Sequence, residues 1–188
     1  KLLSALYAPT CGHLLVDKYQ IVGAALPSYR GLFSAIFADF HLFRKLYGLY
    51  NVRGEPVQKL LTQFQLEHKT AFGGVHFTNI QLSTGQRKRL ALIVALLEDR
   101  PIYVFDEWAA DQDLEFRRYF YEQLLPDLAA QGKTIVAVTH EMGFARSVAN
   151  RMVLFDEGVI VEEGTPQQIF EAPQHDRTKL FLSQILRH

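Results

Sequence analysis

Short apolar runs separated by polar and turn residues predict a series of strands along this chain. A buried strand leaves an unbroken apolar run of about four to eight residues, whereas a hairpin places a turn sequence between two runs. Asp156-Glu157-Gly158 is such a turn sequence, and it lies between the last two runs. The six predicted strands are residues 14–16, 32–37, 102–105, 134–138, 152–155 and 159–162.

Apolar residues spaced three or four positions apart predict helices between these strands. The stretch from residue 42 to about residue 71 has this spacing, and Pro56 suits a first helical turn. Its apolar face is formed by Val57, Leu60, Leu61 and Phe64. The other predicted helices are residues 1–7, 86–98, 113–130 with an interruption at Pro126, 165–171 and 176–186.

Strands that alternate with helices predict an α/β fold, in which a mostly parallel sheet is covered by helices on both faces. The stretch from residue 42 to residue 99 contains no convincing strand, so we expect it to form an inserted helical subdomain. We therefore expect three parts. Residues 1–41 belong to the first part of the sheet core, residues 42–99 form the helical subdomain, and residues 100–188 complete the core.

Composition narrows the class of protein. The chain has 188 residues, of which 48% are hydrophobic and 21% charged, as in an ordinary folded domain. The formal net charge is zero, so no basic excess favours nucleic acid as a partner. A single cysteine, Cys11, fits a reducing compartment. The chain opens at Lys1 inside a predicted helix, and we expect its N-terminus to be truncated.

Two adjacent carboxylates follow the predicted strand 102–105. Ligands bind at the carboxyl ends of strands in open α/β sheets, which is where Asp106 and Glu107 stand. One carboxylate, Asp106, can hold Mg²⁺ directly or through water. The other, Glu107, can orient an attacking water. A strand that simply ends in polar residues explains the pair as well.

A small polar loop, Ser83-Thr84-Gly85-Gln86, opens the predicted helix 86–98. Backbone N–H groups at a helix N-terminus attract anions, and Gly85 allows a phosphate to approach the backbone closely. Ser83 can donate its hydroxyl to the same anion. An ordinary serine cap is the alternative explanation. We call these four residues the signature loop.

His140 follows the predicted strand 134–138 and can reach the same rim of the sheet as Glu107. An imidazole there can donate a hydrogen bond to a terminal phosphate oxygen. For this histidine taken alone, an ordinary surface position is the better explanation.

The order and spacing of these three sites resemble the nucleotide-binding domain of ATP-binding cassette (ABC) ATPases, which have a RecA-like P-loop NTPase fold. The resemblance implies that the signature loop contacts ATP bound by a second domain. It further implies that Asp106 is the Walker B aspartate, Glu107 the catalytic glutamate and His140 the switch histidine. Asp113 matches the D-loop aspartate at the dimer interface.

Residues 32–43 resemble the Q-loop region of the family, where Ala38 stands in place of the usual glutamine and Asp39 follows it. The chain resembles the ATPase domains of cyclic-peptide and siderophore exporters in three features. These are the absence of that glutamine, the sequence LSTGQ and the sequence FDEWAADQD. Beyond His140, the segments 142–145, 155–158 and 162–166 resemble the ATPase subunits of polar amino-acid importers instead. The direction of transport and the solute therefore stay open.

The resemblance implies an ATPase that uses ATP and Mg²⁺ to drive solute transport. Its expected partners are a second nucleotide-binding domain and a transmembrane permease, with no nucleic acid. The expected location is the cytoplasmic side of the inner membrane. Two alternatives remain, which are an ABC ATPase that acts on ribosomes or DNA and a degenerate module that docks on partners without hydrolysis.

The phosphate-binding motif G-x-x-x-x-G-K-[ST] does not occur in the 188 residues. In the family this motif comes before the helix whose sequence Lys1 matches. We therefore expect the P-loop and the first strands to lie upstream of Lys1. The 188 residues alone are therefore expected to bind ATP very weakly or not at all, and to be inactive as an ATPase.

Overall fold

The computed structural model describes residues 1–50 and 52–185, and these fall into two compact units. The first unit comprises residues 1–112 and 128–138. The second comprises residues 113–127 and the chain from residue 139 onward. Each unit is described by itself below.

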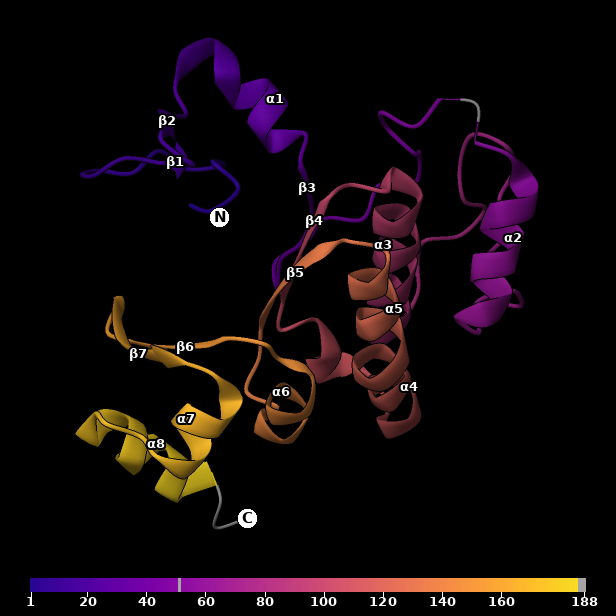
Figure 1. Ribbon diagram of the computed structural model, residues 1–188. Helices are drawn as coiled ribbons and strands as arrows, with labels where there is room; N and C mark the ends of the chain where they lie inside the picture. The colour runs from indigo at the N-terminus through magenta and orange to yellow at the C-terminus, as the bar shows by residue number, and fades with distance from the viewer. Residues whose placement is uncertain (51, 186–188) are drawn as a thin grey trace. The chain divides into compact units, whose positions relative to one another are not determined.

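A three-stranded parallel sheet forms the centre of the first unit. Its strands are β3 (Phe33–Ile36), β4 (Ile102–Asp106) and β5 (Thr134–Val138), in the order β3-β4-β5 (Figure 1). Strand β4 is hydrogen-bonded on both sides, and its residues Tyr103 and Phe105 are almost fully buried. The predicted parallel sheet is confirmed. Strand β5 has the predicted bounds, whereas β3 is one residue shorter at each end and β4 extends one residue further, to Asp106.

Two helices of the predicted helical subdomain belong to this unit. Helix α3 (Thr84–Glu98) contacts β3 and buries Leu90, Leu92 and Ile93. Helix α2 (Gly54–Gln63) contacts α3 and has Val57 and Leu61 buried on its apolar face. Pro56 lies in the first turn of α2, where its missing N–H group has no helical partner to lose.

Two helix predictions were wrong in extent. Among the described residues of 42–71, the helix is limited to α2, because Phe64 ends it and Gln65 takes a left-handed φ of 59°. On the two sides of α2 in the sequence, Lys45 forms an isolated antiparallel bridge with His76 and Phe72 forms one with Phe77. Residues 1–7 form turns, and Ala5 has a φ of 54° that a right-handed helix cannot contain.

The first 30 residues carry short elements that the sequence pattern only partly predicted. The hairpin of β1 (Leu15–Val16) and β2 (Tyr19–Gln20) contains the expected first strand. A 3₁₀ turn, η1 (Gly23–Ala25), leads into α1 (Leu26–Arg30). The hydroxyl of Tyr29 in α1 donates to the carbonyl oxygen of Leu3 at 2.6 Å.

A helix with a π turn opens the second unit. Helix α4 (Leu114–Tyr119) passes through η3 (Phe120–Leu124) into α5 (Leu125–Ala130), whose last three residues belong to the first unit. The N–H group of Leu125 donates to the carbonyl of Phe120, five residues earlier. Pro126 has no N–H group for a regular helical bond, so the wider turn fits the predicted interruption.

The rest of the second unit contains the predicted hairpin and last two helices, together with a helix, α6 (Met142–Val148), that the sequence pattern did not predict. Helix α6 precedes the hairpin of β6 (Met152–Asp156) and β7 (Val159–Gly164). Helices α7 (Pro166–Glu171) and α8 (Asp176–Ile185) come after it. The hairpin and α7 are confirmed, whereas the predicted end of the last helix at Leu186 lies outside the described residues.

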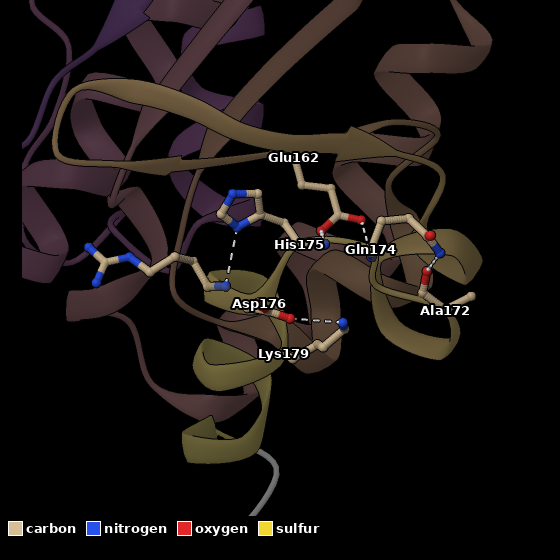
Figure 2. A network of polar contacts seen from close by, with 7 residues as sticks. Glu162, Ala172, Gln174, His175, Asp176 and Lys179 are labelled. Atoms are coloured by element: carbon tan, nitrogen blue, oxygen red, sulfur yellow. Dashed lines mark hydrogen bonds and ion pairs between the residues drawn. The ribbon is translucent and has the colours of Figure 1, made fainter.

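Glu162 ties β7 to the start of α8 (Figure 2). Its carboxylate accepts the backbone N–H of Gln174 at 2.8 Å and that of His175 at 3.1 Å. The hydrogen bond from Gln174, supported by the one from His175, lowers the pKa of Glu162 below its ordinary value. Beside this contact, Lys179 donates to Asp176 at 3.0 Å within the first turn of α8.

Across residues 1–50 and 52–185, every helix is too short or too polar to cross a lipid bilayer.

Candidate functional site

Ser83 caps α3 and shapes the signature loop. Its hydroxyl accepts the N–H of Gln86 at 3.4 Å, and the side chain of Gln86 accepts the N–H of Ser83 at 3.3 Å, which forms a capping box. While it accepts this bond, the hydroxyl can still donate its own hydrogen. Ser83 and Thr84 are exposed. The cap and an anion site at the same helix end are therefore compatible.

Gly85 allows close approach of another part of the chain. A Cβ atom at this position would lie 2.5 Å from the carbonyl oxygen of Asp111. The side chain of Gln112 donates to the carbonyl of Gly85 at 3.1 Å. The sequence led us to expect that Gly85 lets a phosphate approach the backbone. In the structure, its lack of a side chain lets the segment after β4 pack against the start of α3.

Asp106 and Glu107 stand where the sequence predicted, at the carboxyl end of the central strand. Asp106 is the last residue of β4 and pairs in register with Val138 of β5. The N–H of Glu107 donates to the carbonyl of Val138 at 2.9 Å, so the backbone is still bonded to β5. Glu107 then takes a left-handed φ of 49°, which turns the chain into the 3₁₀ helix η2 (Trp108–Asp111).

Lys88 binds this turn to α3. Its side chain is only 4% exposed, and its ammonium donates to the backbone carbonyl of Glu107 at 2.7 Å. The same ammonium pairs with the carboxylate of Asp111 at 2.6 Å. In return, the indole N–H of Trp108 donates to the carbonyl of Lys88 at 3.1 Å. Both ends of η2 are thus bonded to one turn of α3.

The next residue of α3, Arg89, extends these contacts toward α2. Its guanidinium donates to the side-chain oxygen of Gln112 at 2.9 Å and to that of Gln65 at 3.2 Å. It also donates to the carbonyl of Phe64 at 3.4 Å. Because Arg89 is buried, these bonds offset the desolvation of its charge.

The sequence pattern did not predict these hydrogen bonds and this ion pair between α3 and η2. The residues that make them are Lys88, Arg89, Trp108, Asp111 and Gln112. One signal was available, because Lys88 falls on the same helical stripe as the buried Leu92 and Ala95. A lysine on an apolar stripe needs a buried partner of opposite charge. The acidic residues after β4 were the candidates for this partner.

His140 lies in the second unit, in an exposed position between β5 and α6. Both of its neighbours are held by hydrogen bonds. Tyr121 and Thr139 share a hydroxyl–hydroxyl bond of 3.0 Å, and Thr139 also accepts the N–H of Glu141 at 3.0 Å. The ring of Tyr121 stacks on that of Phe144 at 4.7 Å. The residues around His140 are therefore fixed by η3 and α6.

The other predicted site residues are exposed. Asp113 is the N-cap of α4, and its carboxylate accepts the N–H of Phe116 at 2.9 Å. Ala38 and Asp39 follow β3. Asp39 pairs with Lys1 at 2.5 Å, and this hydrogen bond lowers the pKa of the carboxyl. The signature loop, Asp106 and Glu107 belong to the first unit, and Asp113 and His140 to the second.

The end of β4 offers a carboxylate of the kind that Mg²⁺ binds in proteins. The described residues contain no group of three acidic, histidine or cysteine side chains arranged for a metal. Mg²⁺ keeps several waters and binds through one or two carboxylates together with substrate phosphates. Asp106, half-buried at the strand end, offers one such carboxylate.

Comparison with known proteins supports the resemblance to ABC ATPases. The sequence profile of the ABC transporter family matches residues 1–110. The L-cystine import ATP-binding protein TcyC of Bacillus subtilis is 34% identical over 204 aligned residues, which cover 98% of this chain and 80% of TcyC. The chain belongs to the ABC transporter family.

Relatives in this family include proteins much longer than the chain. The ATP-binding protein SyrD of Pseudomonas syringae pv. syringae is 45% identical over 167 residues, or 87% of this chain and 29% of SyrD. A bacterial Atm1-family ABC exporter with ATP bound has the same fold, with a TM-score of 0.79 at 18% identity. That match covers 97% of this chain and 34% of the exporter chain. The predicted P-loop NTPase fold is confirmed, and the chain spans about a third of these two proteins.

Proposed function

We propose that the chain supplies the signature, Walker B and switch elements of an ATPase that drives solute transport across a membrane. One observation carries the proposal. The signature loop that caps α3 is bonded, through Gly85 and Lys88, to the segment that begins with Glu107. The start of the signature helix and the segment after β4 thus form one structural unit, which supports a joint role for the two motifs.

Each candidate residue has a separate role in this proposal. Glu107, at the carboxyl end of β4, accepts a proton from water and orients it for attack on the γ-phosphate. The imidazole of His140 donates to an oxygen of the same phosphate. Asp106 would hold Mg²⁺ directly or through water, and that ion would supply positive charge that neutralises the phosphates.

The proposed partners rest on membership of the family and on the exposed signature loop. The exposed hydroxyl of Ser83 and the N–H groups at the start of α3 would bind the phosphates of an ATP held by a second nucleotide-binding domain. Asp113 would lie at the interface with that domain. The ATPase would work beside a transmembrane permease on the cytoplasmic face of the membrane. The proposal does not specify the solute or the direction of transport.

ATP hydrolysis by the full-length protein in lipid vesicles tests this function. We expect hydrolysis to require Mg²⁺, and we expect Asp106→Asn to raise the Mg²⁺ concentration needed for half-maximal rate. A protein that binds ATP but does not hydrolyse it under any of these conditions would instead be the degenerate docking module.

A further inference from the structure

Lys88 makes contacts that a solvent-exposed lysine on a helix would not make. Its side chain is 4% exposed, so its charge has been removed from water almost completely. Burial of an ammonium is costly unless hydrogen bonds and an opposite charge compensate for it. The carbonyl of Glu107 at 2.7 Å and the carboxylate of Asp111 at 2.6 Å provide this compensation.

The bond to Glu107 acts on a backbone that needs support. Glu107 has a φ of 49°, a left-handed conformation that a residue with a Cβ atom seldom adopts. Its N–H is bonded to Val138 of β5 and its carbonyl to Lys88 of α3. The peptide groups on both sides of the glutamate are therefore fixed, one by the sheet and one by the signature helix.

We propose that Lys88 is a positioning residue for Glu107. By holding the carbonyl of Glu107 and the carboxylate of Asp111, it sets the direction in which the chain leaves β4 and therefore the place of the glutamate side chain. This inference rests on the proposed function of Glu107. It adds that the signature loop and the catalytic glutamate, which act on two different ATP molecules, are joined through one buried ammonium.

The chain contains a matched control at the other end of α3. Lys133 donates to the carbonyl of Asp99 at 3.2 Å and pairs with the carboxylate of the same residue at 2.6 Å. Asp99 is the C-cap of α3 and has a left-handed φ of 50°. The two lysines therefore make the same pair of contacts to a left-handed turn, but only Lys88 makes them at a candidate catalytic residue.

The test compares Lys88→Met with Lys133→Met in the full-length protein, with steady-state kinetics and thermal melting. Misplacing a catalytic group by about 1 Å can lower a rate on the order of 100-fold. We expect Lys88→Met to lower kcat by roughly 10- to 100-fold while KM for ATP changes less than about twofold. Lys133→Met should lower the melting temperature but leave kcat within about twofold of the wild type. A wild-type kcat in a folded Lys88→Met protein would overturn the inference.

Two further variants keep the test decisive. If Lys88→Met does not fold, Asp111→Asn removes only the charged partner of the ammonium, and we expect a smaller loss of kcat with KM unchanged. A wild-type kcat in Asp111→Asn would then count against the inference. In a Glu107→Gln background, Lys88→Met should cause no further loss in single-turnover hydrolysis, since its effect passes through Glu107. A loss of the same size in both backgrounds would overturn the positioning role, whereas normal hydrolysis by Glu107→Gln alone would overturn the proposed function instead.

Discussion

The α-carbon of Gly85 faces the backbone carbonyl of Asp111 so closely that a Cβ atom would lie 2.5 Å from that oxygen. The neighbour is backbone within η2, so it cannot move aside as the end of a flexible side chain could. The close approach lets the start of the signature helix and the segment after Glu107 pack together.

Gly85→Ala should therefore destabilise the protein and slow hydrolysis. Alanine is favoured over glycine inside a helix by up to about 1 kcal/mol. Forcing a methyl group into a closed contact costs about 1–3 kcal/mol, which outweighs that gain. We expect a lower melting temperature and a lower kcat, because η2 must shift.

Gly143→Ala is the matched control, since Gly143 lies in α6 with no atom within 4 Å of an added Cβ. This variant should be as stable as the wild type or more stable.

The capping box of Ser83 has a counterpart that separates capping from ATP binding. Thr165 caps α7 by the same two bonds to Gln168, at 3.3 and 2.8 Å. Replacing either cap by alanine should cost about 1 kcal/mol of stability. Only Ser83→Ala should also slow ATP hydrolysis, on the order of 100-fold if the hydroxyl donates to phosphate in the transition state. Equal hydrolysis rates in Ser83→Ala and Thr165→Ala would show that Ser83 is an ordinary cap.

Tyr121 is expected to support His140 through Thr139. Tyr121→Phe keeps the ring that stacks on Phe144 but removes the hydroxyl bonded to Thr139. A hydrogen bond of this kind contributes about 1 kcal/mol, so we expect a loss of kcat of roughly fivefold. Tyr29→Phe, which removes a hydroxyl bonded to Leu3, should leave kcat unchanged. The idea fails if both variants lower kcat equally.

Acid should weaken the contact between β7 and α8. The pKa of Glu162 is lower in the folded chain than its ordinary value of about 4.5, because backbone N–H groups bind the charged form. The stabilisation is therefore complete above about pH 4.5 and is lost as the pH falls through the lowered pKa. Glu162→Gln should be less stable than the wild type at pH 7, and the difference should shrink in acid.

The contact of Glu162 and the neighbouring contact between Asp176 and Lys179 should respond differently to added salt. The pKa of Glu162 is lowered mainly by hydrogen bonds from neutral groups, first the N–H of Gln174, whereas the pKa of Asp176 is lowered by its hydrogen bond to the charged Lys179. Added salt should weaken the contribution of Asp176 more than that of Glu162. Melting curves from pH 3 to pH 7 at low and high salt would check both points. Identical pH profiles for the wild type and Glu162→Gln would contradict the assigned role.

Periodicity predicted the sheet and the helices α3, α7 and α8, but it did not predict α1 or α6. Strand β5 has the predicted bounds, and α7 begins one residue later than predicted, at Pro166 after the cap Thr165, because an unbroken apolar run and a capping sequence are local signals. The helix from residue 42 was overextended, because the left-handed turn at Gln65 has no clear sequence signal. The local pattern also could not foresee the bridge between Lys45 and His76.

The candidate site was predictable in its motifs but not in its connections. Asp106 and Glu107 follow β4 as expected, and the signature loop opens α3. The bonds of Lys88 to Glu107 and Asp111 join residues 19 or more positions apart, and such contacts depend on how α3 packs on the sheet. For the same reason, Gly85 was assigned to a phosphate contact while its approach to Asp111 was overlooked.

ATP turnover by Glu107→Gln in the full-length protein tests the central claim most directly. Glutamine keeps the size of the side chain but cannot accept a proton from water, and loss of a general base typically lowers a rate by about 10²- to 10⁴-fold. We predict a loss of at least about 100-fold in single-turnover hydrolysis, with ATP affinity by calorimetry within about threefold of the wild type. Near-normal hydrolysis in this variant would contradict the account, because Glu107 would then have no part in the reaction.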